Sequence, residues 1–358
     1  MLKTISSTCF LTLGILCHAQ IPTVPFHDAH IRYEGRILEH ADAAEFSWSG
    51  TSATITFRGT QLSAVMKDLD TANYYNVIVD GRVISKFHTD TVKKSYVLAT
   101  GLKRGKHTVQ LFKRTEWDKG KTWFYGFEFP GKAKVLPPPA LKKRKIEFYG
   151  NSITCGYANE DSSGKDSWFG YFQNNYLTYA AITARHFNAQ YHCIAKSGIG
   201  IMLSWFPLIM PEMYDRCDPT DPGSKWDFSV YTPDVVVINL FQNDSWLVQK
   251  PDHAEFKSRF GAQAPNDAYI VAAYKDFVSS IRHKYPDASI ICALGSMDAT
   301  RQGSPWPDYI RQALAQMNDP KTYVHFFEFK NTGGHPNVEE QQIMADSLIG
   351  FIEKNIDW

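Results

Sequence analysis

The chain has 358 residues, which is long enough for two domains. Its formal net charge of +1 at pH 7 lacks the basic excess that marks proteins binding nucleic acid or anionic membranes. The 44% hydrophobic residues allow ordinary cores, and the 14% aromatic residues fit either a sugar-binding surface or a β-rich core.

The N-terminus has the pattern of a secretory signal peptide. Lys3 is followed by a short apolar stretch and then by the small residue Ala19. This pattern predicts a signal peptide over residues 1–19 and a secreted or periplasmic protein with a bacterial style of signal. A lipoprotein signal ending at Cys17 is the weaker alternative, because Leu16 is bulky where such signals favour a small residue.

The next segment contains short runs in which apolar and polar residues alternate, as half-buried strands do. Asp80 and Gly81 add the signal of a hairpin turn. The predicted strands cover residues 53–57, 62–66, 75–79, 83–85, 95–99, 107–112 and 123–129. Strands at this spacing predict a β-sandwich domain over residues 20–134.

A composition change marks the end of this domain. Residues 135–144 contain three consecutive prolines followed by a basic cluster, which predicts a stiff, solvated linker. From residue 145 to residue 358, apolar strands alternate with amphipathic helices. The predicted strands cover residues 146–149, 191–195, 235–240, 289–294 and 323–327, and the predicted helices cover residues 179–187, 268–284, 309–317 and 339–354. This order predicts a parallel sheet covered by helices on both faces.

Polar residues follow directly after three of these predicted strands. Ser152, Gly198 and Asn243 each lie just past a strand, and ligands of parallel sheets bind beyond the carboxyl ends of the strands. An ester hydrolase needs a hydroxyl nucleophile, a base and donors for the oxyanion. Ser152 is the candidate nucleophile, and His335, in a glycine-flanked loop before the last helix, is the candidate base. Each residue alone fits an ordinary turn, but their order favours an esterase site.

These residues also carry a family resemblance. Residues 149–154 (YGNSIT), 197–200 (SGIG), 242–244 (QND) and 335–336 (HP) resemble the four sequence blocks of SGNH (GDSL-type) hydrolases. With the preceding β-sandwich, the mature chain resembles carbohydrate esterase family 2, whose members remove acetyl groups from plant cell-wall polysaccharides. The resemblance implies a jelly-roll domain packed on a three-layer α/β/α SGNH domain.

The resemblance further implies a role for each block. Ser152 is the expected nucleophile and His335 the expected base. The oxyanion hole would consist of the Ser152 and Gly198 backbone N–H groups and the Asn243 side chain. The expected partner is acetylated polysaccharide such as xylan or glucomannan, with acetyl on the primary 6-hydroxyl preferred. No metal or organic cofactor is expected, and no metal-ligand spacing in the sequence indicates one.

The sequence departs from the family pattern at two places. Asn151 stands where the block usually has Asp, which predicts a tolerated change in local hydrogen bonding. SGNH enzymes often carry an Asp two or three residues before the His, and here Thr332 and Gly333 occupy those positions. We therefore expect a Ser–His dyad in which His335 donates its other N–H to a backbone carbonyl or to a polar group from elsewhere. Asp298 is a weaker candidate for a third member.

Aromatic residues near these blocks are candidates for contacting sugar. Trp246, three residues after Asn243, is the expected substrate contact, although it would equally shield a core edge. Trp168, Trp205 and Trp306 lie in polar or proline-containing stretches and could also flank a cleft, but the sequence assigns none of them individually. Two other functions stay open: an SGNH esterase, lipase or thioesterase acting on other esters, and a carbohydrate-binding protein with a degenerate site.

Overall fold

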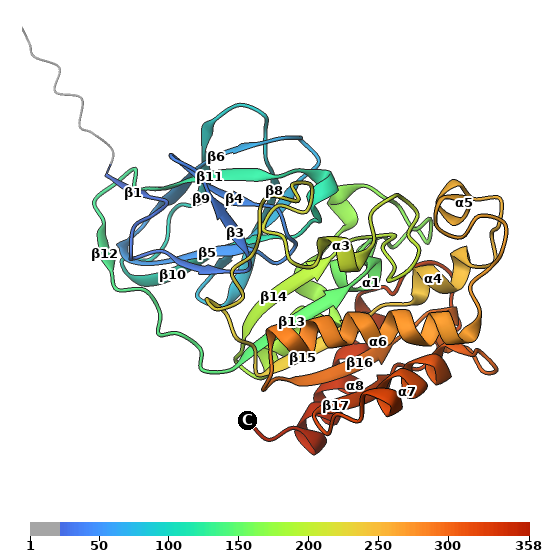
Figure 1. Ribbon diagram of the computed structural model, residues 1–358. Helices are drawn as coiled ribbons and strands as arrows, with labels where there is room; N and C mark the ends of the chain where they lie inside the picture. The colour runs from blue at the N-terminus through green and yellow to red at the C-terminus, as the bar shows by residue number, and fades with distance from the viewer. Residues whose placement is uncertain (1–21) are drawn as a thin grey trace, which may run out of the picture.

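A computed structural model describes residues 22–358 (Figure 1). The predicted signal peptide lies outside these residues. The chain forms a β-rich domain followed by an α/β domain, as the sequence predicts.

The N-terminal domain consists of two six-stranded antiparallel sheets that face each other. One sheet has the order β3-β4-β11-β6-β9, with β1 paired to β11, and the other has the order β12-β5-β10-β7-β8, with β2 paired to β5. The strands are β1 Thr23–Pro25, β2 Arg32–Glu34, β3 Ile37–Glu39, β4 Ala44–Phe46, β5 Ser52–Gly59, β6 Leu62–Asp68, β7 Tyr74–Val79, β8 Arg82–His88, β9 Lys94–Ala99, β10 Gly105–Lys113, β11 Thr122–Glu128 and β12 Lys134–Leu136.

Alternation of side chains explains this sandwich. Ile55 and Phe57 of β5, two residues apart, are fully buried between the sheets, and so are Val109 and Leu111 of β10. Strand β12 pairs with β5 and therefore reaches two residues into the segment expected as a linker. The prediction of a β-sandwich is confirmed.

The C-terminal domain is built on a parallel sheet of five strands in the order β14-β13-β15-β16-β17. These strands are β13 Lys145–Gly150, β14 Gln190–Ala195, β15 Val235–Asn239, β16 Ser289–Leu294 and β17 Thr322–Phe326. Every residue of β15, the central strand, is buried, because helices cover both faces of the sheet. The continuous apolar run that predicted this strand has the same cause.

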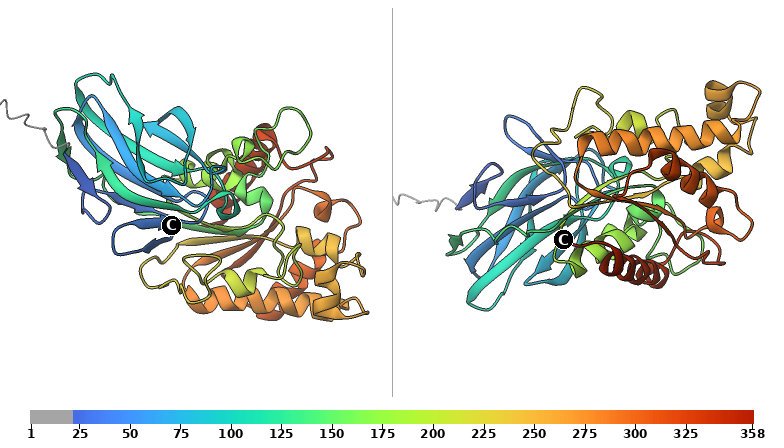
Figure 2. Two further views of the ribbon diagram at one scale, coloured as in Figure 1. Left: turned by 90° about the horizontal axis from the view of Figure 1, so that it is seen from above. Right: turned by 60° about the horizontal axis from the view of Figure 1, so that its bottom comes forward.

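Two pairs of helices form the outer layers. Helices α2 (Tyr179–His186) and α8 (Val338–Asn355) pack on one face, and α6 (Asp267–Lys284) and α7 (Trp306–Met317) pack on the other (Figure 2). Shorter helices lie in the loops at the carboxyl ends of the strands and beside them: α1 Ser152–Cys155, α3 Met210–Met213, α4 Gln242–Leu247, α5 Ala254–Phe260, and the single turns η1 Trp117–Lys119, η2 Gly170–Phe172, η3 Asn175–Leu177 and η4 Asp298–Thr300. This three-layer arrangement confirms the predicted α/β/α fold.

Two further observations concern residues 22–358. Their four cysteines, Cys155, Cys193, Cys217 and Cys292, are all buried free thiols. No helix in this part of the chain combines the length and the apolar composition needed to cross a lipid bilayer.

A buried ion pair joins the two domains. Arg36, between β2 and β3, donates to Glu147 of β13 at 2.5 Å, and neither side chain is exposed to solvent. The same guanidinium donates to the Tyr149 hydroxyl and to the backbone carbonyls of Tyr214 and Arg216. The sandwich is therefore fixed against the parallel sheet by hydrogen bonds as well as by packing.

Candidate active site

Ser152 begins α1 directly after β13. Asn151 caps this short helix by accepting a hydrogen bond from the Ile153 backbone N–H at 3.0 Å. Asn151, which stands where the block usually has Asp, thus takes part in the local hydrogen bonding at the start of α1. Ser152 therefore lies at the carboxyl end of the parallel sheet, where the expected site is located.

His335 lies in the loop before α8 and reaches Ser152. Its Nε2 is 2.8 Å from Ser152 Oγ, the distance of a hydrogen bond between a hydroxyl and a base. The ring of Tyr157 packs against the imidazole with the ring centroids 4.5 Å apart. The predicted nucleophile and base are therefore in contact.

A carboxylate completes this arrangement, which corrects the expectation of a dyad. Asp166 Oδ2 is 2.7 Å from His335 Nδ1, and Oδ1 accepts a hydrogen bond from the His335 backbone N–H at 3.0 Å. The loop that carries Asp166 is held by Asp161, which accepts hydrogen bonds from the backbone N–H groups of Ser163 and Ser167. Ser152, His335 and Asp166 thus form the contact chain of a Ser–His–Asp triad.

Gly334 permits this approach. Its φ is +67°, and a Cβ at this position would lie 3.3 Å from the Asp166 carboxyl carbon. Burial raises the pKa of Asp166 and the hydrogen bonds and charge of His335 lower it more strongly in sum, so the pKa lies below its ordinary value. The carboxylate therefore stays charged beside the imidazole.

Asp298, the weaker candidate for a third member, has a different partner. Its carboxylate accepts hydrogen bonds from Trp246 Nε1 at 2.9 Å and from Gln242 Nε2 at 2.9 Å. The carboxylate is thereby committed to orienting the Trp246 indole. The assignment of Asp298 to the triad is wrong, because Asp166 occupies the side of the imidazole that it would need.

The expected oxyanion donors line the same cleft as Ser152. The backbone N–H groups of Ser152 and Gly198 have no hydrogen-bond acceptor within residues 22–358. The Asn243 side chain uses one N–H to donate to the Ile199 carbonyl at 2.8 Å, which leaves its second N–H free for a ligand. Gly198 has a φ of +82°, a conformation that favours glycine at this position.

These groups line one open cleft with a volume of about 410 Å³. Its lining residues are Asp118, Lys119, Ser152, Tyr157, Trp168, Lys196, Ser197, Gly198, Trp205, Asn243, Trp246 and His335. Trp168 and Trp205 are 59% and 41% exposed, so both side chains are partly accessible to solvent at the cleft. Trp306 is only 5% exposed and belongs to the core beneath α7, so it is not among the residues that line the cleft.

Sequence reasoning missed two contributions to this site. Asp166 lies in a polar loop rich in Ser and Gly, where an aspartate is typical of any turn. Asp118 and Lys119 belong to η1, a turn of the β-sandwich domain that reaches the cleft of the α/β domain. Neither segment has a periodic pattern, so only the folded structure could bring these residues to Ser152.

The fold and the site define a class of protein. A parallel α/β sheet that carries Ser152, His335 and Asp166 in one contact chain, beside unpaired N–H donors, is a serine hydrolase site of the SGNH type. Comparisons of the sequence agree with this class. Residues 33–139 match the family described as "Carbohydrate esterase 2 N-terminal", and residues 148–325 match the "GDSL-like Lipase/Acylhydrolase family".

Two relatives with similar sequences are named as esterases, one of them also as a cellulase. The chain is 35% identical over 340 residues to the "Cellulase/esterase CelE" of Acetivibrio thermocellus, an alignment that covers 92% of this chain and 40% of CelE. It is 24% identical over 348 residues to an "Acetylxylan esterase / glucomannan deacetylase" of Cellvibrio japonicus, covering 94% of this chain and 92% of the relative.

A solved structure extends the likeness to three dimensions. A family two carbohydrate esterase from Clostridium thermocellum in complex with cellohexaose has a TM-score of 0.81 and 36% identity, covering 90% of this chain and 98% of that one. This protein belongs to carbohydrate esterase family 2.

Proposed function

We propose that this protein hydrolyses O-acetyl esters on plant cell-wall polysaccharides such as xylan or glucomannan, with a preference for acetyl on the primary 6-hydroxyl. The observation that carries the proposal is the Ser152–His335–Asp166 contact chain at the base of an open cleft. The N-terminal signal pattern supports action outside the cytoplasm, as a secreted or periplasmic enzyme.

In the proposed reaction, His335 Nε2 takes the proton of Ser152 Oγ while the oxygen attacks the acetyl carbonyl carbon. Asp166 accepts a hydrogen bond from His335 Nδ1–H, which fixes the tautomer with Nε2 free and stabilises the imidazolium that forms. The oxyanion accepts hydrogen bonds from the Ser152 and Gly198 N–H groups and from the free N–H of Asn243.

The imidazolium then donates its proton to the leaving sugar hydroxyl, and an acetyl-enzyme remains on Ser152. Water in the open cleft attacks the acetyl carbonyl carbon while His335 takes its proton. The second tetrahedral intermediate collapses to acetate as His335 returns that proton to Ser152 Oγ. Each step uses only residues of this chain and the same donor set.

The cleft supports a glycan as the substrate. The partly exposed side chains of Trp168 and Trp205, with Trp246 held by Asp298, give the cleft an aromatic lining of the kind that packs against sugar rings. The Clostridium thermocellum relative was solved with cellohexaose, and the Cellvibrio relative is named as acting on acetylated xylan and glucomannan. Because this chain spans only 40% of CelE, the activity of that whole protein is not transferred to it.

Acetate release from acetylated glucomannan and acetylated xylan tests the proposal. We expect release by the wild type and loss of at least about 10³-fold in Ser152→Ala, with an unchanged circular dichroism spectrum. Ser258→Ala, which alters an exposed serine of α5, is the matched control and should keep full activity. Full activity of folded Ser152→Ala would show that the nucleophile is misassigned.

The alternative functions give different results in the same assay. A lipase-like or thioester hydrolase would act on other esters but not on acetylated polysaccharide. A binding protein with a degenerate site would bind the polysaccharide without releasing acetate from any substrate.

A further inference from the structure

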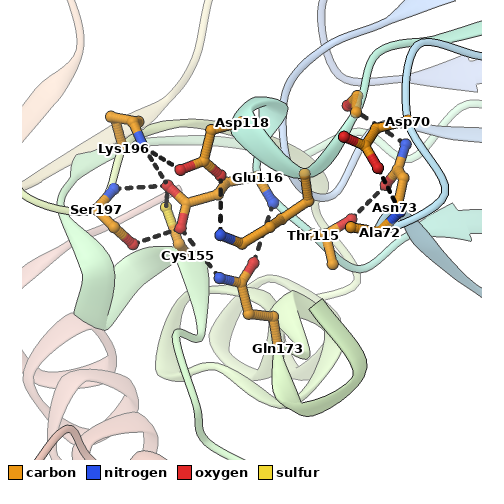
Figure 3. A network of polar contacts seen from close by, with 12 residues as sticks. Asp70, Ala72, Asn73, Thr115, Glu116, Asp118, Cys155, Gln173, Lys196 and Ser197 are labelled. Atoms are coloured by element: carbon orange, nitrogen blue, oxygen red, sulfur yellow. Dashed lines mark hydrogen bonds and ion pairs between the residues drawn. The ribbon is translucent and has the colours of Figure 1, made fainter. Parts of the chain in front are cut away.

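A buried carboxylate of the β-sandwich contacts the loop that carries the Gly198 N–H. Glu116 lies between β10 and η1 and is not exposed to solvent. Its carboxylate accepts hydrogen bonds from the Ser197 backbone N–H at 2.7 Å and from the Ser197 hydroxyl at 2.5 Å (Figure 3). Ser197 is the residue directly before Gly198, so this contact reaches the donor loop from the other domain.

Glu116 is itself held in place by neighbouring groups. Gln173 Nε2 donates to its Oε1 at 3.2 Å, and Lys196 Nζ lies 3.3 Å from its Oε2 (Figure 3). Lys196 also pairs with Asp118 at 2.6 Å, so one ammonium group joins two carboxylates of the sandwich. The backbone of the Glu116 turn is supported by Lys113, whose buried ammonium donates to the Thr115 carbonyl at 2.7 Å.

These contacts keep Glu116 ionised despite its burial. Burial raises the pKa of Glu116, while the charge of Lys196 and the hydrogen bonds from Ser197 lower it, and the pKa lies below its ordinary value. A charged carboxylate makes stronger hydrogen bonds to N–H and O–H donors than a neutral acid. Lys196 offsets the negative charge close to the place where the oxyanion forms.

The same loop is anchored at its other end within the hydrolase domain. Asp244 accepts hydrogen bonds from the backbone N–H groups of Ile201, Met202 and Leu203 at 2.7–3.0 Å. Gly198 lies between the two anchors, with a φ of +82° and an N–H that has no acceptor within residues 22–358. Because glycine is the least restricted residue, the direction of this N–H depends on the anchors on either side.

We infer that Glu116 is a positioning residue of the oxyanion hole: the β-sandwich domain aligns the Gly198 N–H of the hydrolase domain through Ser197. The inference rests on the proposed function and assigns the β-sandwich a part in the chemistry. Removing the carboxylate leaves Ser152, His335 and Asp166 in place but lets the Gly198 peptide turn away from the oxyanion.

The test compares 4-nitrophenyl acetate with 4-nitrophenyl thionoacetate, in which sulfur replaces the carbonyl oxygen. Sulfur is a weaker hydrogen-bond acceptor, so the ratio of kcat/KM for ester over thionoester measures the benefit of the oxyanion hole. In Glu116→Gln we expect kcat for the ester to fall about 10–100-fold with KM changed less than about twofold, and the ratio to fall.

Two further variants make the test specific. Ser197→Ala removes only the hydroxyl donor and should lower kcat by about threefold or more, together with the ratio. Lys121→Met is the matched control, because it breaks an ion pair with Asp218 across the same domain boundary without touching Ser197. Its ester-to-thionoester ratio should equal that of the wild type.

An unchanged kcat in folded Glu116→Gln would overturn the inference, as would a fall in kcat at an unchanged ratio, which indicates a purely structural role. A lowered ratio in Lys121→Met would overturn it too. If Glu116→Gln does not fold, the same two quantities are measured for Ser197→Ala. An unchanged kcat, or a fall in kcat at an unchanged ester-to-thionoester ratio, would then overturn the inference. Inactivity of the wild type toward both esters would overturn the proposed function, and this inference with it.

Discussion

At the scale of single residues, the contact between His335 and Asp166 determines how the base is oriented. In Asp166→Asn, the amide nitrogen can donate to Nδ1 and so favours the tautomer in which Nε2 carries the proton. That tautomer cannot accept the Ser152 proton. We expect kcat for acetyl esters to fall about 10²–10⁴-fold with little change in stability, measured by steady-state kinetics and thermal unfolding.

The control for this variant is Asp298→Asn, which changes the other aspartate considered for the triad. Asp298 contacts Trp246 and Gln242 rather than His335, so its variant should affect KM more than kcat. A larger fall in kcat for Asp298→Asn than for Asp166→Asn would contradict the structural assignment and favour a Ser152–His335 dyad.

The difference between these two aspartates shows what sequence can reveal at this scale. Ser152 and His335 were recognisable because strand ends and glycines mark their positions, and these local features survive folding. Asp166 was not, because it reaches His335 across 169 residues of chain from a turn without a distinctive pattern. A partner set by tertiary contact alone leaves no local signal.

At the scale of elements, the loop between Ser197 and Leu203 is anchored at its Leu203 end by one buried carboxylate, that of Asp244. Burial raises the pKa of Asp244 to about 6, and the hydrogen bonds from Met202, Ile201 and Leu203 only partly offset this. Between the ordinary pKa of 3.8 and about 6, the native protein therefore binds a proton that the unfolded chain does not. By this group alone, the free energy of unfolding rises as the pH falls through that range.

Comparing Asp244→Asn with the wild type isolates this contribution. The amide replaces an acceptor oxygen by a donor nitrogen that faces backbone N–H groups, so we expect a loss of about 1–3 kcal/mol at about pH 7. Because the variant cannot take up the proton, its deficit in unfolding free energy should be larger at about pH 4.5 than at about pH 7. Urea unfolding at both pH values measures the deficit. A deficit that is the same at both values would show that Asp244 does not titrate in this range.

The regular elements of this chain were predictable, but the loops that carry Asp166 and Glu116 were not. Continuous apolar runs such as β15, and amphipathic periods such as α6, follow from burial on one or both faces. The turn that carries Glu116 joins β10 to η1, and its charged residues are typical of a solvated hairpin end. Its burial against Ser197 is a consequence of how the domains pack.

At the scale of the whole molecule, the two domains behave as one unit because their interface contains buried charges. Arg36 and Glu147 form an ion pair with both side chains inaccessible to solvent, and the Tyr285 hydroxyl donates to the same carboxylate at 2.5 Å. The sandwich therefore cannot separate from the sheet without exposing or isolating these charges. The proposed role of Glu116 requires such a fixed arrangement, since a mobile sandwich could not align Gly198.

Arg36→Met tests this coupling. It leaves the Glu147 charge buried without its partner, so we expect a loss of about 3–5 kcal/mol in the free energy of unfolding. In Arg36→Met combined with Glu147→Gln, the uncompensated charge is gone while the amide can still bond Tyr285, so at least about half of that loss should be recovered. Urea unfolding followed by circular dichroism and by tryptophan fluorescence should give coincident transitions for the wild type, because sandwich and hydrolase unfold together. Two separate transitions in the wild type, or a double variant no more stable than Arg36→Met, would show that the pair does not couple the domains.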